Sequence, residues 1–97
     1  MRTILQDEKE CYVCQTRCRL EDHHIFHGRA YRKKSEARGL KVWLCAADHR
    51  GDDGVHFNHK LDLELKKLAQ EYYEEHYGNR KDFINEFGKS YCDVDLQ

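Results

Sequence analysis

The chain has 97 residues, of which 39% are apolar and 36% are charged, and its formal net charge is −1. A domain of this size has a thin apolar core and often needs disulfides or a structural metal for stability. The odd number of cysteines, five, and the lack of an apolar leader argue against disulfides, and no apolar run approaches the ~18–20 residues that span a bilayer. We therefore expect a single cytoplasmic domain over residues 1–97, in which cysteine thiolates bind a metal.

The first motif along the chain is a pair of cysteines, Cys11 and Cys14, separated by two residues. This spacing leaves room for one zinc ion between the two thiolates of a tight knuckle. The mixed segment 20–26 that follows is predicted to be a short strand. It carries the adjacent histidines His23 and His24, and successive side chains on a strand point to opposite faces. One imidazole can therefore bind a metal while its neighbour faces another way.

Positive charge is concentrated in the middle of the chain. Residues 26–50 contain seven Lys or Arg against two acids, a local net of +5, whereas residues 59–97 contain six against nine, a net of −3. A polyanion is therefore expected to meet the middle of the chain. Within this region, 29–38 is predicted to be a helix ending at Gly39, or else an ordered loop, and the alternating segment 40–44 is predicted to be a strand.

A second cluster of candidate ligands, Cys45, Asp48 and His49, follows this predicted strand. Cys45 supplies a third thiolate, but Asp48 occupies the position at which a fourth cysteine is expected. Carboxylates bind zinc, although less often than cysteine does in closed structural sites. The fourth zinc ligand is therefore open between Asp48, His49 and Cys18, and the alternative is a set of buried free thiols.

The C-terminal third is predicted to consist of two helices. Asn58 is a suitable N-cap for a helix over about 59–77, and Asn79 begins a second helix over about 80–88. The first helix has an apolar face formed by Leu61, Leu65, Leu68 and Tyr72. In the second helix, three residues are expected to point inward: Phe83, Ile84 and Phe87. The acidic face of both helices is expected to lie away from the bound polyanion, or to contact a protein partner.

Together these motifs resemble a known family. A Cys-x-x-Cys knuckle is followed by Asp-His-His-Ile at 22–25, a basic stretch, a strand that ends in Leu-Cys at 44–45, and Gly-Val-His-Phe-Asn at 54–58 before a helix. This order is similar to that of the HNH endonucleases of the ββα-metal (treble-clef) type, especially small phage and prophage members, including the group related to the phage recombination-enhancement nuclease. The resemblance covers residues 11 to about 60. It implies an α+β treble-clef core with a short β-hairpin, followed by the two C-terminal helices.

The resemblance implies a metal-dependent endonuclease that nicks or cleaves DNA in the cytoplasm of a bacterial host, with a recombination or phage protein as a further partner. His24 matches the general base, and three residues match the ligands of one catalytic divalent ion (Mg²⁺, Mn²⁺, Ni²⁺ or Zn²⁺): His23, His49 and His56. Cys11, Cys14 and Cys45 match the structural Zn²⁺ site, and Asp48 is assigned to it at the position of the fourth ligand. The expected contacts to the phosphate backbone are Arg29, Arg32, Lys33 and Lys34.

The chain departs from the family pattern at two points. Asp48 replaces a cysteine of the second knuckle, and no asparagine lies between His24 and His49, where the family has the residue that orients the loop around the base. Asn58 is the nearest substitute, but a helix N-cap explains it better. The alternative function is a catalytically inactive zinc module that binds DNA or a protein partner. A redox or metal-sensing protein fits less well, because nothing in the sequence predicts a βαβ unit.

Overall fold

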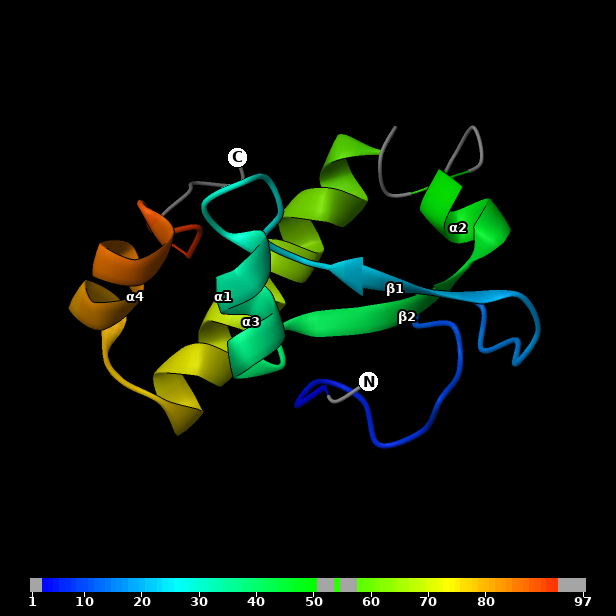
Figure 1. Ribbon diagram of the computed structural model, residues 1–97, viewed down its shortest axis with the longest axis horizontal. Helices are drawn as coiled ribbons and strands as arrows, with labels where there is room; N and C mark the ends of the chain where they lie inside the picture. Colours follow the sequence, from blue (N-terminus) through cyan, green and yellow to red (C-terminus); the bar gives the residue numbers. More distant parts are fainter. Residues whose placement is uncertain (1–2, 51–53, 55–57, 93–97) are drawn as a thin grey trace.

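The computed structural model describes residues 3–50, 54 and 58–92. Its elements in chain order are β1 (Leu20–His24), α1 (Arg32–Arg38), β2 (Lys41–Cys45), α2 (Ala46–Arg50), α3 (His59–His76) and α4 (Arg80–Phe87). The two strands form an antiparallel pair, and the segment that connects them contains α1 (Figure 1). The helix α2 follows β2 directly. The α+β class expected from the sequence is therefore confirmed. None of the described helices has the length and apolar character needed to cross a membrane.

Local sequence signals determine where the helices begin and end. Asn58 caps α3 by accepting a 3.1 Å hydrogen bond from the Leu61 amide. Asn79 and Asp82 form the reciprocal capping box of α4, with hydrogen bonds of 2.9 and 3.0 Å. Gly39 ends α1 in the left-handed conformation, with φ of 70°, which favours glycine. These caps agree with the predicted boundaries, which for α3 and α4 differ from the observed ones by one residue.

The register of the hairpin separates the two adjacent histidines. His23 lies opposite Val42, and His24 lies opposite Lys41. Residues that lie opposite each other share a face of the sheet, and successive residues alternate between faces. His23 is therefore on one face and is 2% exposed, while His24 shares the other face with Lys41. The expected divergence of the two imidazoles follows from this pairing.

Part of the apolar core is a cluster of aromatic rings that joins the segment after β1 to α3 and α4. The helix α4 lies at the end of the molecule opposite to α2 (Figure 1). The Phe26 ring lies 5.4 Å from that of Phe83 and 4.6 Å from that of Phe87, between ring centroids. Tyr73 on α3 packs edge-on against Phe83 at 5.3 Å. The segment after β1 is therefore attached to the C-terminal helices through aromatic contacts.

Two details of the predicted helix faces are wrong. The fully buried apolar residues of α3 are Leu65, Ala69 and Tyr73, whereas Tyr72 is only half-buried. On α4, Phe83 and Phe87 are buried as expected, but Ile84 is 37% exposed. The buried stripe of α3 thus follows an i, i+4, i+8 spacing that faces Phe83 of α4.

Truncation of Phe83 is expected to test this core. Phe83→Ala removes a fully buried ring, and we expect it to lower the free energy of unfolding by about 3–5 kcal/mol. Ile84→Ala, one position away on the exposed side of α4, is the matched control and should cost less than about 1 kcal/mol. Urea denaturation of both variants measures the difference. Equal losses for the two variants would contradict the assigned orientation of α4.

Candidate metal centre and histidine cleft

The N-terminal knuckle is held against β2 by backbone hydrogen bonds. The Cys11 amide donates to the Thr16 carbonyl at 2.8 Å, and the Gln15 amide donates to the Cys11 carbonyl at 2.9 Å. Gln15 closes this turn with a φ of 62°. The Tyr12 amide donates to the Trp43 carbonyl at 2.9 Å, which attaches the knuckle to the hairpin. The knuckle thiols consequently lie beside the end of β2.

Three thiols and one carboxylate meet at this point. The ligand atoms of Cys11, Cys14, Cys45 and Asp48 all lie within 4.8 Å of one another. Asp48 Oδ2 is 3.1 Å from Cys11 Sγ and 3.2 Å from Cys45 Sγ, and the Sγ atoms of Cys14 and Cys45 are 3.7 Å apart. A tetrahedral zinc ion with Zn–S bonds of about 2.3 Å requires sulfur–sulfur separations of about 3.8 Å. The cluster could therefore hold a metal ion of this size.

The sequence left three candidates for the fourth ligand: Asp48, His49 and Cys18. The structure places Asp48 in the cluster. Asp48 lies in the short helix α2, which begins immediately after Cys45, so both side chains reach the same point. Cys18 is exposed and is not part of the group, and His49 faces the neighbouring cleft. All five cysteines belong to the described residues, and each is a free thiol.

The charges in the cluster indicate why a cation would bind. A backbone hydrogen bond at Thr16 lowers the pKa of Cys14, but the Asp48 carboxylate, desolvation and the neighbouring thiols together raise it to about 12. The hydrogen bonds from Cys11 and Cys45 lower the pKa of Asp48. The thiols of Cys11 and Cys45 thus both donate hydrogen bonds to the Asp48 carboxylate. A divalent cation that binds the thiolates would displace these protons.

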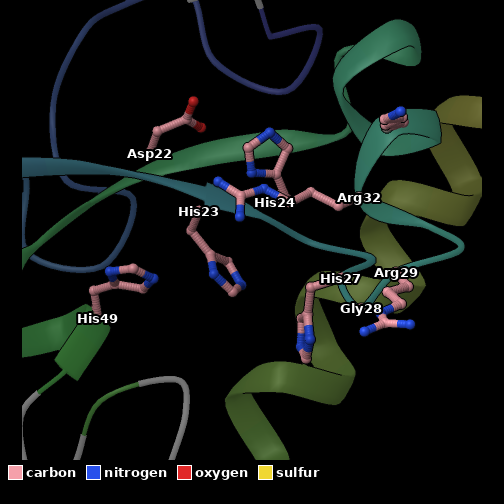
Figure 2. Close-up of a pocket in the computed structure, with 9 residues that line it drawn as sticks. Asp22, His23, His24, His27, Gly28, Arg29, Arg32 and His49 are labelled. Atoms are coloured by element: carbon pink, nitrogen blue, oxygen red, sulfur yellow. The ribbon is translucent and has the colours of Figure 1, made fainter.

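A cleft of about 490 Å³ runs along β1 (Figure 2). Histidines and cations form most of its wall, and the lining residues are Asp22, His23, His24, His27, Gly28, Arg29, Arg32, Lys33 and His49. In Figure 2, His23 and His49 lie on one side of the strand, and His24 and Asp22 lie on the other. Every described histidine to which the sequence assigned a role therefore lines this cleft. His27, to which no role was assigned, lines it as well.

His23 and His49 are brought together by β1 and α2. Their ring centroids are 5.1 Å apart in an edge-on arrangement. His49 Nδ1 lies 2.7 Å from a carboxylate oxygen of Glu21, which shares the face of β1 on which His23 lies. Such a carboxylate fixes the orientation of a metal-binding imidazole. His56, the third expected ligand, lies outside the described residues, and within them no third donor joins His23 and His49 in a group as tight as the cysteine cluster.

His24 is held on the opposite face by a network that the sequence did not reveal. Its Nε2 lies 2.8 Å from Glu36 Oε1 on α1. The other carboxylate oxygen of Glu36 accepts a 2.5 Å hydrogen bond from Lys41 Nζ, and Lys41 is only 1% exposed. Asp22 lies 3.7 Å from the same ammonium group. A buried cation and two carboxylates therefore surround the histidine that was assigned as the base.

The four basic residues that were expected to contact phosphate divide into two groups. Arg29, Arg32 and Lys33 line the cleft beside the histidines. Lys34 instead donates a 2.7 Å hydrogen bond to the backbone carbonyl of Glu86 on α4. Only the first group therefore lies where a phosphate in the cleft could be contacted, and Lys34 attaches α1 to α4.

The fold and these two sites define a small α+β protein in which a Cys₃Asp cluster that could hold a metal ion lies near a basic, histidine-lined cleft. Comparisons of the chain with protein-family models, with curated proteins and with solved structures give no significant match. A function is therefore inferred from the two sites and from the motifs that form them.

Proposed function

We propose that the protein is a metal-dependent DNA endonuclease of the HNH type. The observation that carries this proposal is the placement of His23 and His24 on opposite sides of β1, both lining one cleft. His23 pairs with His49, as two ligands of an ion would, whereas His24 pairs with a carboxylate, as a general base would. The cations beside them match a phosphate substrate.

The Cys₃Asp cluster is proposed to hold the structural zinc ion. Three thiolates in a tetrahedral set favour zinc over magnesium or calcium, which prefer oxygen ligands. The ion would join the knuckle, β2 and α2, because these three segments supply its four donors. It would thereby hold α2, and with it His49, beside β1.

The proposed reaction is hydrolysis by a water molecule. His24 takes a proton from the water as its oxygen bonds to phosphorus, one of the two P–O ester bonds breaks, and the leaving oxygen takes a proton from solvent. When bound at His23 and His49, a divalent ion supplies stabilisation of the charge on the phosphate and on the leaving oxygen. No enzyme nucleophile is required, so no covalent intermediate forms.

Contacts to phosphate are assigned to the cations of the cleft, Arg29, Arg32 and Lys33. We expect the double variant Arg32→Ala/Lys33→Ala to bind duplex DNA more weakly, and to reduce the slope of log affinity against log salt by about 2. The double variant Lys60→Ala/Lys81→Ala, at exposed positions on α3 and α4, is the control with the same change of charge. Fluorescence anisotropy across a salt series measures both slopes. Equal slopes for the two double variants would argue against this cleft as the DNA site.

The direct test is incubation of supercoiled plasmid with the zinc-loaded protein and added Mg²⁺, Mn²⁺, Ni²⁺ or Zn²⁺. The proposal predicts that nicked circles accumulate with at least one of these ions and that a chelator stops the reaction. A folded, zinc-loaded protein that leaves the plasmid intact with every ion would overturn the proposal.

A non-catalytic zinc module that binds DNA is the second candidate. It is favoured by the finding that, among the described residues, the ligand atoms of His23, His27 and His49 do not form a three-donor group as tight as the cysteine cluster. Metal stoichiometry separates the two candidates, because the module needs one tightly held ion whereas the nuclease binds a second, weaker one. Mass spectrometry of the native protein, titrated with Mn²⁺ or Ni²⁺ after zinc loading, counts these ions.

A further inference from the structure

We propose that Glu36, anchored by the buried Lys41, is a positioning residue that orients His24 and makes Nδ1 the nitrogen that accepts the proton. This inference rests on the proposed function, since it concerns the base of the same reaction. HNH enzymes use an asparagine to orient the segment around the base, and this chain has none between His24 and His49. Glu36 would take over the orienting role from a different element, α1.

The geometry connects three elements through one carboxylate. Glu36 Oε1 lies 2.8 Å from Nε2 of His24 on β1, and Glu36 Oε2 lies 2.5 Å from Nζ of Lys41 on β2. His24 and Lys41 lie directly opposite each other in the hairpin. The carboxylate therefore bridges a cross-strand pair, and neither partner can rotate away without breaking a charge-assisted contact.

The contact with Glu36 determines which ring nitrogen of His24 carries the hydrogen. Hydrogen bonds from Lys41, and then from His24, lower the pKa of Glu36 to about 2, so its side chain is an ionised carboxylate near neutral pH. An ionised carboxylate only accepts hydrogen bonds, so Nε2 must carry the hydrogen. In a neutral imidazole the other nitrogen, Nδ1, then holds the lone pair. Nδ1 is consequently the atom that can take a proton from water.

The position of Glu36 is fixed by contacts of the neighbouring residue. Ser35 is fully buried, and its hydroxyl accepts a 3.1 Å hydrogen bond from the Phe26 amide and donates a 2.7 Å bond to the Phe26 carbonyl. Phe26 follows β1 by two residues and packs in the aromatic core. These contacts hold α1 against the strand that carries His24.

A metal site made by the same residues is the competing interpretation. The ligand atoms of Asp22, His24 and Glu36 lie within 4.8 Å of one another. The Lys41 ammonium, however, already contacts both carboxylates, at 3.7 Å to Asp22 and 2.5 Å to Glu36. A divalent cation bound there would meet this buried positive charge. The network is therefore better explained as a support for the base.

The kinetic test compares Glu36→Ala, Glu36→Gln and the control Glu71→Ala, an exposed glutamate on α3. We expect Glu36→Ala to lower kcat about 10–100-fold, as the loss of an orienting partner does. KM for DNA should not rise, because the change removes a negative charge from beside a phosphate site. Glu36→Gln should not recover kcat, because its single amide oxygen would accept from the buried Lys41 ammonium, which leaves the amide NH2 group, a donor, facing Nε2 of His24. Wild-type kcat in Glu36→Ala, or a loss confined to KM, would overturn the proposal.

Nitrogen NMR of the labelled full-length protein provides a readout that does not need cleavage. We expect wild-type His24 to be the Nε2-protonated tautomer, and Glu36→Ala to give a mixture of tautomers at unchanged zinc content. The variant should remain folded but melt at a lower temperature, because the buried Lys41 loses its nearest carboxylate. A wild-type His24 protonated at Nδ1, or a tautomer that does not respond to Glu36→Ala, would overturn the proposal. Wild-type protein that does not cut DNA would count against the nuclease, while the tautomer would still decide whether Glu36 orients His24.

Discussion

Replacement of Cys45 by serine is expected to leave the protein unfolded at about 25 °C, because it removes one of the three thiol donors of the proposed zinc site. Structural zinc contributes about 10–16 kcal/mol in small zinc domains, whereas the whole stability of a domain is about 5–15 kcal/mol. Cys45 also joins the end of β2 to both the knuckle and α2.

Cys18→Ser is the matched control for this prediction. Cys18 is an exposed thiol in the same N-terminal segment and lies outside the cluster. Its replacement should leave the melting temperature and the bound zinc unchanged. Circular dichroism melts and elemental analysis of both variants give the result. A folded, stable Cys45→Ser protein, or loss of zinc in Cys18→Ser, would show that the cluster is assigned wrongly.

His24→Ala is expected to lower the rate of DNA cleavage about 10²–10⁴-fold, which is the contribution of a general base. The fold should survive, because His24 lies outside the apolar core and its main contact is the hydrogen bond to Glu36. DNA affinity should also be retained, since the cations of the cleft are unchanged.

His76→Ala is the control for this variant. His76 is an exposed histidine in the last turn of α3, outside the cleft. The His76→Ala variant should cleave DNA at the wild-type rate in the same assay. Melting temperature and DNA affinity are measured for His24→Ala and His76→Ala alike. Undiminished cleavage by His24→Ala, or its failure to fold, would remove His24 from the role of base.

Much of the fold could be predicted because its signals are local. Asn58, Asn79 and Gly39 act through their own side chains or backbone angles, so each marks a helix end without reference to distant residues. The alternation of side chains along β1 likewise separates His23 from His24, whatever the rest of the chain does.

The orientation of the helices could not be predicted in the same way. Leu68 and Tyr72 fit an apolar stripe on α3 as well as Ala69 and Tyr73 do, and the choice depends on where Phe83 packs. Gln70 is also buried, and its amide group is satisfied there by hydrogen bonds with the Ser90 hydroxyl and the Tyr91 amide. Such choices arise from tertiary contacts that periodicity does not contain.

The cysteine spacing in the sequence predicted that Cys11, Cys14 and Cys45 come together, but it gave no sign of the residues that contact the histidines. Glu36 and Lys41 appear in the sequence only as charges within a basic stretch. They become partners of His24 because the register of the hairpin places Lys41 opposite it and α1 returns Glu36 to the same face. A search for carboxylates near the predicted strand partner of His24 would have found Glu36.

Cleavage in heavy-oxygen water is the sharpest test of hydrolysis in the histidine-lined cleft. Zinc-loaded protein, supercoiled plasmid and a divalent ion are incubated in labelled water, and the ends at the nick are analysed by mass spectrometry. Hydrolysis by a water molecule that His24 activates predicts one labelled oxygen in each terminal phosphate, and about 10²–10⁴-fold fewer labelled ends with His24→Ala. An intact plasmid with every ion, or phosphate ends without label, would contradict the account of this cleft as the site of a hydrolytic nuclease.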